Sequence, residues 1–188
     1  MEPLESERLS SRGTTHTFRL DTDVKTKLDE LSQRQNKSVN ALANKALRKL
    51  VEWDATSEEL GNITLSSRLL AKLMEFASTE QTRELANWAS INVFNDLVQL
   101  LFQKKNLTSV IATLALLDKY AGAFTLEHGF SKGKHTLIIL HKMGLKWSLF
   151  YEELIVKMLS PLKDIIRNVS ATSSENQVVI SIEVESGI

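Results

Sequence analysis

The feature that most constrains the fold is a short alternating stretch that stands alone near the start of the chain. Residues 15–20 read THTFRL, and the next strand-like pattern begins only at Ala123. Alternation of polar and apolar residues is typical of a β-strand with one exposed and one buried face. A lone strand leaves its backbone N–H and C=O groups unpaired, which is costly. We therefore expect this stretch to pair with a distant segment or with its own copy across a two-fold axis.

Two helices are predicted directly after this stretch. Asp21 is a good N-cap for a helix over residues 22–35, and Asn36 suits the left-handed position that closes it. Ser38 is the expected N-cap of a second helix over residues 39–53. One strand and two short helices bury too little surface to fold alone. We therefore expect two copies to associate through an antiparallel two-stranded ribbon.

The exposed face of that ribbon carries Thr15, Thr17 and Arg19, which are hydrogen-bonding rather than packing side chains. A two-stranded ribbon fits the major groove of DNA, as it does in the β-ribbon readers Arc and MetJ. There an arginine can donate to guanine, and hydroxyls can read several base edges. The pattern predicts DNA binding.

Residues 15–53 resemble a ribbon-helix-helix DNA-binding domain of the Arc/CopG type. The resemblance implies an intertwined dimer with base-reading residues on the strand, namely Thr15, Thr17 and Arg19. It also implies that the start of the second helix holds a DNA phosphate, through Ser38, Val39 and Asn40. His16 departs from the family pattern, which usually has an aliphatic residue there.

Charge is unevenly distributed along the chain. The whole sequence has 23 Lys/Arg and 23 Asp/Glu, so its formal net charge is zero. Residues 14–53 contain eight basic and five acidic residues, which gives a local charge of +3. Contact with DNA phosphates depends on local charge, so this distribution is compatible with the predicted DNA-binding module.

The sequence divides into a flexible tail over 1–13, a ribbon-helix-helix domain over 14–53, a linker over 54–62 and a larger α+β domain over 63–188. The larger domain is expected to serve in dimerisation and possible sensing. Its predicted elements are helices over 66–77, 81–104 and 107–120, a hairpin of 123–130 with 135–141, a helix over 146–159, and strands over 165–171 and 178–184. The helices over 81–104 and 107–120 are apolar on more than one face, which predicts a central position or a subunit interface.

Catalytic and metal-binding patterns are weak. The chain has no cysteine, no GxSxG and no HExxH, and the spacing of His128, His135 and His141 matches no common metal-ligand motif. The aromatic cluster Trp147–Tyr151 is better explained by core packing than by a ligand pocket. We therefore predict no metal, no cofactor and no enzymatic activity.

The resulting prediction is a cytoplasmic, homodimeric or tetrameric transcriptional regulator that binds double-stranded DNA, with a small-molecule effector left open. No apolar run reaches the length of a membrane span, so no membrane contact is expected. The alternative is a protein-interaction module, antitoxin-like or an assembly scaffold, with little or no DNA binding.

Overall fold

The computed structural model describes residues 14–185 and divides the chain into two compact units, Met1–Leu47 and Arg48–Ile188. The first unit contains α1 (Thr22–Gln35) and most of α2 (Val39–Lys49). Helix α1 coincides with the predicted range, and Asn36 closes it in the left-handed conformation with φ of 51°. No residue of α1 is buried, and Leu42 is the buried residue of α2.

The predicted N-terminal strand is absent. Residues 14–21 have no regular secondary structure, and the side chains of 14–20 are exposed. Phe18 is 59% exposed and Leu20 is 48% exposed, so the face predicted to be buried faces solvent. The physical reason is that no strand within residues 14–185 pairs with this segment. The four-stranded sheet is built from strands between Thr125 and Val184 and does not include this segment.

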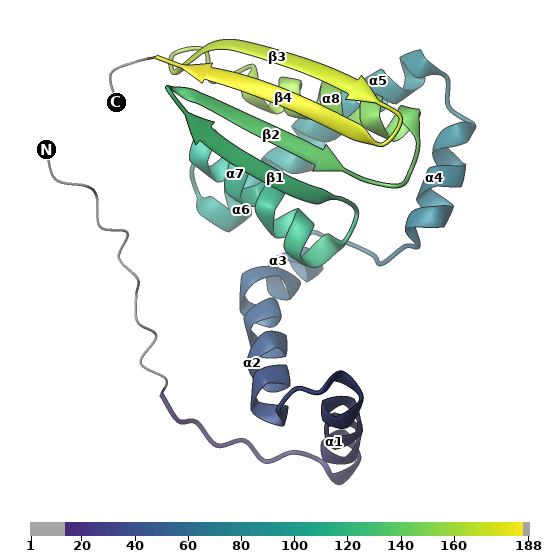
Figure 1. The fold of residues 1–188 in the computed structure, drawn as a ribbon, viewed down its shortest axis with the longest axis vertical. Coiled ribbons are helices and arrows are strands. Elements are labelled where there is room, and N and C mark those ends of the chain that lie inside the picture. Colours follow the sequence, from purple (N-terminus) through teal and green to yellow (C-terminus); the bar gives the residue numbers. More distant parts are fainter. Residues whose placement is uncertain (1–13, 186–188) are drawn as a thin grey trace, which may run out of the picture. The chain divides into compact units, whose positions relative to one another are not determined.

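The predicted fold class, an intertwined ribbon-helix-helix domain followed by a larger α+β domain, is therefore wrong. The structure is a helix-rich α+β chain in which the described strands all belong to the second unit (Figure 1). The division between units also falls before Arg48 rather than after Trp53. The segment expected to be a linker, 54–62, contains a helix instead.

The second unit begins with helices. They are η1 (Leu50–Asp54, a π-helical turn), α3 (Ala55–Glu59), α4 (Ser67–Glu75), α5 (Thr79–Asn92), α6 (Phe94–Phe102), α7 (Leu107–Leu116) and η2 (Leu117–Ala121, a second π-helical turn). The single helix predicted over 81–104 is broken at Val93, whose φ and ψ of −125° and −59° leave the helical region.

The sheet is formed by β1 (Thr125–Ser131), β2 (Lys134–Leu140), β3 (Ile166–Ser174) and β4 (Gln177–Val184), in the order β1-β2-β4-β3 with every neighbouring pair antiparallel. Helix α8 (Leu145–Leu159) lies between β2 and β3 in the sequence. It packs on β3 and β4, and α5 packs on α8 (Figure 1).

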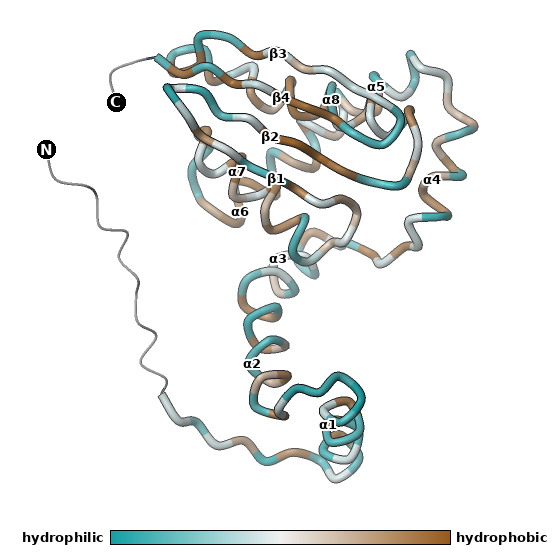
Figure 2. Tube along the Cα trace, in the orientation of Figure 1, coloured by the Kyte–Doolittle hydropathy of each residue, from teal (hydrophilic) through white to brown (hydrophobic). Residues whose placement is uncertain are grey.

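The core of the second unit lies between the helices and one face of the sheet. Alternate residues of β2 and β4 are fully buried, and the apolar colouring of these two strands is visible in Figure 2. Helix α8 supplies the opposite wall because its apolar residues occur on most of its circumference. The fully buried apolar side chains of these elements are Leu137, Ile139, Val178, Ile180, Ile182, Leu154, Ile155, Met158 and Leu159.

No helix within residues 14–185 is both long enough and apolar enough to cross a membrane.

Candidate binding groove

A groove of about 560 Å³ opens on the helical part of the second unit. Three helical segments line it: η1 with the start of α3, the end of α6, and α7 with η2. Its surface is mostly apolar, with one charged rim. The lining residues are Val51, Glu52, Thr56, Leu100, Leu101, Phe102, Ala112, Ala115, Leu116 and Lys119.

The apolar part of the groove is exposed to solvent. Val51 is 75% exposed, Leu100 40% and Phe102 36%. The residues that α7 contributes are small, since Ala112 and Ala115 lie three positions apart on one face of the helix. Small side chains between larger apolar ones leave room for a complementary apolar ridge.

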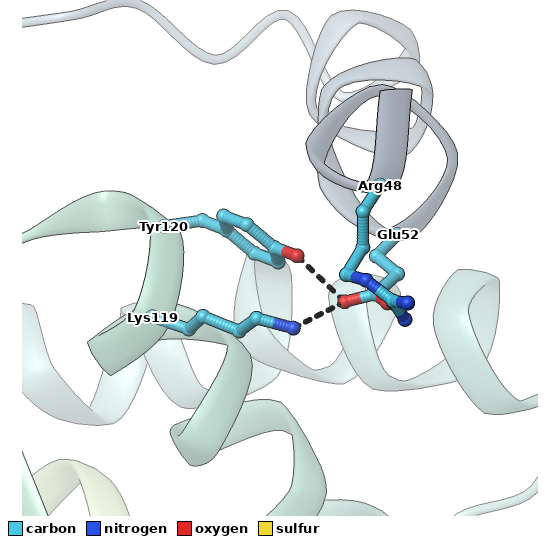
Figure 3. Close-up of polar contacts among 4 residues, drawn as sticks. All are labelled: Arg48, Glu52, Lys119 and Tyr120. Atoms are coloured by element: carbon cyan, nitrogen blue, oxygen red, sulfur yellow. Dashed lines mark hydrogen bonds and ion pairs between the residues drawn. The ribbon is translucent and has the colours of Figure 1, made fainter. Parts of the chain in front are cut away.

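The rim of the groove is organised around the Glu52 carboxylate (Figure 3). Its Oε2 accepts hydrogen bonds from the Lys119 amine at 2.6 Å and the Tyr120 hydroxyl at 2.6 Å. Its Oε1 accepts a hydrogen bond from an Arg48 guanidinium nitrogen at 3.0 Å. One acidic group is therefore shared by two cations, and the cluster has a formal charge of +1.

The two π-helical turns position this cluster. Glu52 lies on η1, and Lys119 and Tyr120 lie on η2. The buried Trp53 side chain stacks on the Tyr120 ring, with 6.4 Å between ring centroids and 26° between ring planes. A π-turn shifts the register of a helix locally and is often found at functional sites. Here each of the two π-turns carries one residue of the Glu52–Lys119 pair.

The hydrogen bonds also determine the charge of the rim. Donation from Lys119, Tyr120 and Arg48 lowers the pKa of Glu52 from its ordinary value of 4.5 to about 2. The same carboxylate raises the pKa of Lys119. Both groups are therefore charged at neutral pH, and the rim keeps its excess positive charge.

The residues predicted to read DNA bases lie outside any helix or strand, and their predicted role is not tested by this geometry. Thr15, Thr17 and Arg19 lie on the exposed, irregular segment before α1. Ser38 caps α2, since its hydroxyl accepts a hydrogen bond from the Ala41 amide at 3.1 Å.

The residues predicted to bind phosphate, Ser38, Val39 and Asn40, are at the start of α2 as expected. The Asn40 side chain accepts a hydrogen bond from the Asn44 amide at 3.1 Å. Their predicted role in holding phosphate is not tested by this geometry.

His141 forms a buried hydrogen-bonded pair with Ser148 at 2.9 Å. Its Nδ1 accepts from the Met143 amide at 3.2 Å, so Nε2 carries the proton and donates to the Ser148 hydroxyl. The Ser148 hydroxyl in turn donates to the Glu175 carbonyl at 3.2 Å. A histidine that donates to a serine cannot act as its general base, so this pair links α8 to the sheet rather than forming a catalytic dyad.

The aromatic cluster of α8 has the packing role predicted from the sequence. Trp147 contacts Phe150 and Tyr151, with ring centroids 5.0 and 5.6 Å apart. Its indole N–H donates to the Leu70 carbonyl at 3.1 Å, which fixes α4 on α8. None of these aromatic residues lines the groove.

Sequence reasoning missed both partners at the rim. Glu52 and Lys119 are 67 positions apart, and each is an ordinary charged residue in a helical pattern. The sequence did indicate the apolar faces of α6 and α7, and both helices line the groove. The charged rim could not be predicted, because it depends on how η1 and η2 are placed in space.

Comparison with known proteins assigns no family. No protein-family model matches the chain, and no curated protein matches it. The similar solved structures include a Cs H-NOX variant with an unnatural amino acid, at 14% identity and TM-score 0.39 over 95% of this chain and 80% of that chain. A T. tengcongensis H-NOX mutant has 14% identity and TM-score 0.42 over 77% of this chain and 94% of that chain.

A third similar structure is an oxygen-binding H-NOX domain related to soluble guanylate cyclases, with 15% identity and TM-score 0.24 over 94% of this chain and 78% of that chain. Scores of this size do not establish a common fold, so neither haem nor gas binding is inferred for this protein. The sequence resemblance of residues 15–53 to ribbon-helix-helix domains remains a prediction.

The prediction of a DNA-binding transcriptional regulator is wrong. Within residues 14–185 there is no N-terminal strand to form the DNA-reading ribbon, and the described strands all lie between Thr125 and Val184. Double-stranded DNA is therefore not supported as a partner. The homodimer inferred from the ribbon loses its basis together with it, whereas the subunit contact expected from the apolar helices over 81–104 and 107–120 stays a prediction.

Proposed function

We propose that the protein is a protein-interaction module that binds an amphipathic helix of a partner in the groove between η1, α6 and α7. The observation that carries the proposal is an exposed apolar groove with small residues on one side and a cationic rim. Helix-in-groove recognition uses such a surface, with apolar anchors at i, i+3 or i+4, and i+7 of the bound helix.

The charge of the rim specifies the partner further. Because Arg48 and Lys119 share one acidic partner, an acidic residue beside the apolar stripe of the bound helix would complete the set. The side chains of Arg48 and Lys119 are 65% and 49% exposed. An ion pair between either of them and the bound helix would therefore contribute little to the affinity. The apolar contact supplies most of the binding free energy, and the charges orient the helix.

The proposal describes a binding protein and not an enzyme. It is consistent with the tautomer of the neutral His141 ring, which donates from Nε2 to the Ser148 hydroxyl and so does not serve as a general base for it. A cytoplasmic location, predicted from the sequence, is part of the same proposal.

A displayed library of amphipathic helices tests the proposal. The probe is a phage library of helices of roughly 18 residues, five turns long, with varied apolar and flanking positions. It is panned against the wild-type protein and then compared on two variants. Ala115→Arg fills the groove from an exposed position, whereas Thr108→Arg places the same charge on an exposed part of α7 outside the groove.

Enriched helices are expected to carry an apolar stripe flanked by an acidic residue. Their affinity should fall at least tenfold, about 1.4 kcal/mol, on Ala115→Arg and should be unchanged on Thr108→Arg. Helices that bind both variants like the wild type would overturn the proposal. The proposal would also be overturned if the library contained no helix that binds the wild-type protein more tightly than the Ala115→Arg variant.

A further inference from the structure

The hairpin of β1 and β2 brings two histidines together, and neither of them lines the groove. Its two loop residues, Lys132 and Gly133, both have positive φ, 51° and 75°, as a tight two-residue hairpin turn requires. The resulting register pairs Phe130 with His135 and His128 with Leu137. His128 and His135 are therefore diagonal neighbours on one face of the sheet.

The two imidazole rings point their nitrogens at each other. Nε2 of His128 lies 2.9 Å from Nδ1 of His135. The ring planes differ by 11° and the centroids are 5.2 Å apart, which describes nearly coplanar rings joined edge to edge. In this arrangement one ring donates a proton to the lone pair of the other.

The surroundings leave the pair accessible. The His128 side chain is exposed, and the Phe130 ring, 59% exposed, lies 4.4 Å from the His135 ring. A metal ion can therefore reach the imidazole nitrogens from solvent, and imidazole nitrogen is a common ligand of transition metals.

We propose that His128 and His135 form a two-nitrogen chelating site for a divalent transition metal ion, with Cu²⁺ bound most tightly. The remaining coordination positions would be filled by water, since residues 14–185 contain no group of three or more potential His, Cys, Asp or Glu ligands. The site lies outside the groove and does not depend on its function.

The affinity order of divalent first-row metals places Cu²⁺ above Zn²⁺ at a site of two imidazole nitrogens. The two nitrogens are 2.9 Å apart, so rotation of the rings can direct both lone pairs at one ion with metal–nitrogen bonds of about 2.0–2.1 Å.

Binding requires a change of tautomer but no net release of protons from neutral rings. The ion takes the lone pairs of His128 Nε2 and His135 Nδ1, and the protons then reside on His128 Nδ1 and His135 Nε2. Each ring must also turn, because the ion lies off the line joining the two nitrogens. The exposed position of His128 allows this rotation.

The test is a titration of the full chain with Cu²⁺, in which isothermal calorimetry measures the affinity and electron paramagnetic resonance identifies the ligand atoms. His128→Ala and His135→Ala each remove one ligand, and His16→Ala is the control because His16 is exposed on the irregular segment before α1. Circular dichroism checks that every variant keeps its fold.

The wild-type protein should bind one Cu²⁺ with hyperfine splitting from two nitrogens. Each ligand variant should lose one nitrogen from the spectrum and bind at least tenfold more weakly, about 1.4 kcal/mol. Zn²⁺ should bind more weakly than Cu²⁺, and His16→Ala should match the wild type. Unchanged Cu²⁺ affinity in either ligand variant, or a wild-type spectrum without two nitrogens, would overturn the proposal.

Discussion

The Lys119 amine donates a hydrogen bond of 2.6 Å to the Glu52 carboxylate, joining two π-helical turns separated by 67 positions in the sequence. The same carboxylate receives the Tyr120 hydroxyl and the Arg48 guanidinium. One acidic side chain thus fixes the geometry of the rim and sets its charge.

This arrangement predicts a specific acid dependence. The pKa of Glu52 is lowered from 4.5 to about 2 in the folded protein, so its stabilising contribution is fully present above pH 4.5. The contribution should be lost as the pH falls from 4.5 toward 2. Urea unfolding of the wild type and Glu52→Gln should therefore show a stability difference at pH 6 that shrinks on acidification. An unchanged difference at pH 3 would contradict the lowered pKa.

The buried His141 side chain predicts a second pH dependence of the folding stability, in a range of higher pH than that of Glu52. Burial lowers the pKa of His141 from 6.5, so the folded state disfavours its protonation. The unfolded chain then binds more protons, and stability should fall as the pH drops below 6.5. His141→Gln should lose this slope and, because it disrupts the hydrogen bonds to Ser148 and Met143, should cost about 1–3 kcal/mol at pH 7.5. His135 also has a lowered pKa, so His135→Ala is the control. In this variant the loss of stability below pH 6.5 that is due to His141 should still be observed.

Neighbouring positions on α5 predict opposite responses to substitution. Ala86 is fully buried in the core beneath α8, whereas Leu85 is 44% exposed. Ala86→Leu should overpack the core and cost about 1–3 kcal/mol of unfolding free energy. Leu85→Ala should change it by no more than about 0.5 kcal/mol. Thermal unfolding of both variants checks the placement of α5, and equal effects would argue against it.

The helix N-termini offer a matched test of capping. Ser78 forms a reciprocal capping box with Gln81 at the start of α5, whereas Ser66 begins α4 without a side-chain cap. Ser78→Ala should destabilise the protein by about 1 kcal/mol. Ser66→Ala should have almost no effect, since no hydrogen bond is lost. Chemical denaturation of the two variants would detect the difference, and a reversed order would contradict the cap assignment.

The sequence was informative where local patterns decide the structure. Residues 22–35 form the predicted helix, and the alternating strands around 123–141 and 178–184 pair as hairpin and sheet. Asn36 occupies the left-handed position that its residue type favours. These features depend on periodicity and caps, which act over a few residues.

Long-range placement could not be read in the same way. The stretch at residues 15–20 has a strand-like alternation but no strand partner within residues 14–185, so alternation alone did not make a strand. The meeting of Glu52 with Lys119 depends on two π-turns that no local pattern indicated. The contact of His128 with His135, by contrast, follows from the hairpin register once the turn at Lys132 and Gly133 is recognised.

The strand order β1-β2-β4-β3 also has a kinetic consequence. Two of its three pairings, β1 with β2 and β3 with β4, join strands adjacent in sequence, and hairpins of this kind form within roughly 1–10 μs. The pairing of β2 with β4 closes a loop that contains all of α8 and β3. Because non-local contacts require this loop closure before they become stabilising, the joining of the two hairpins should set the folding rate of the sheet.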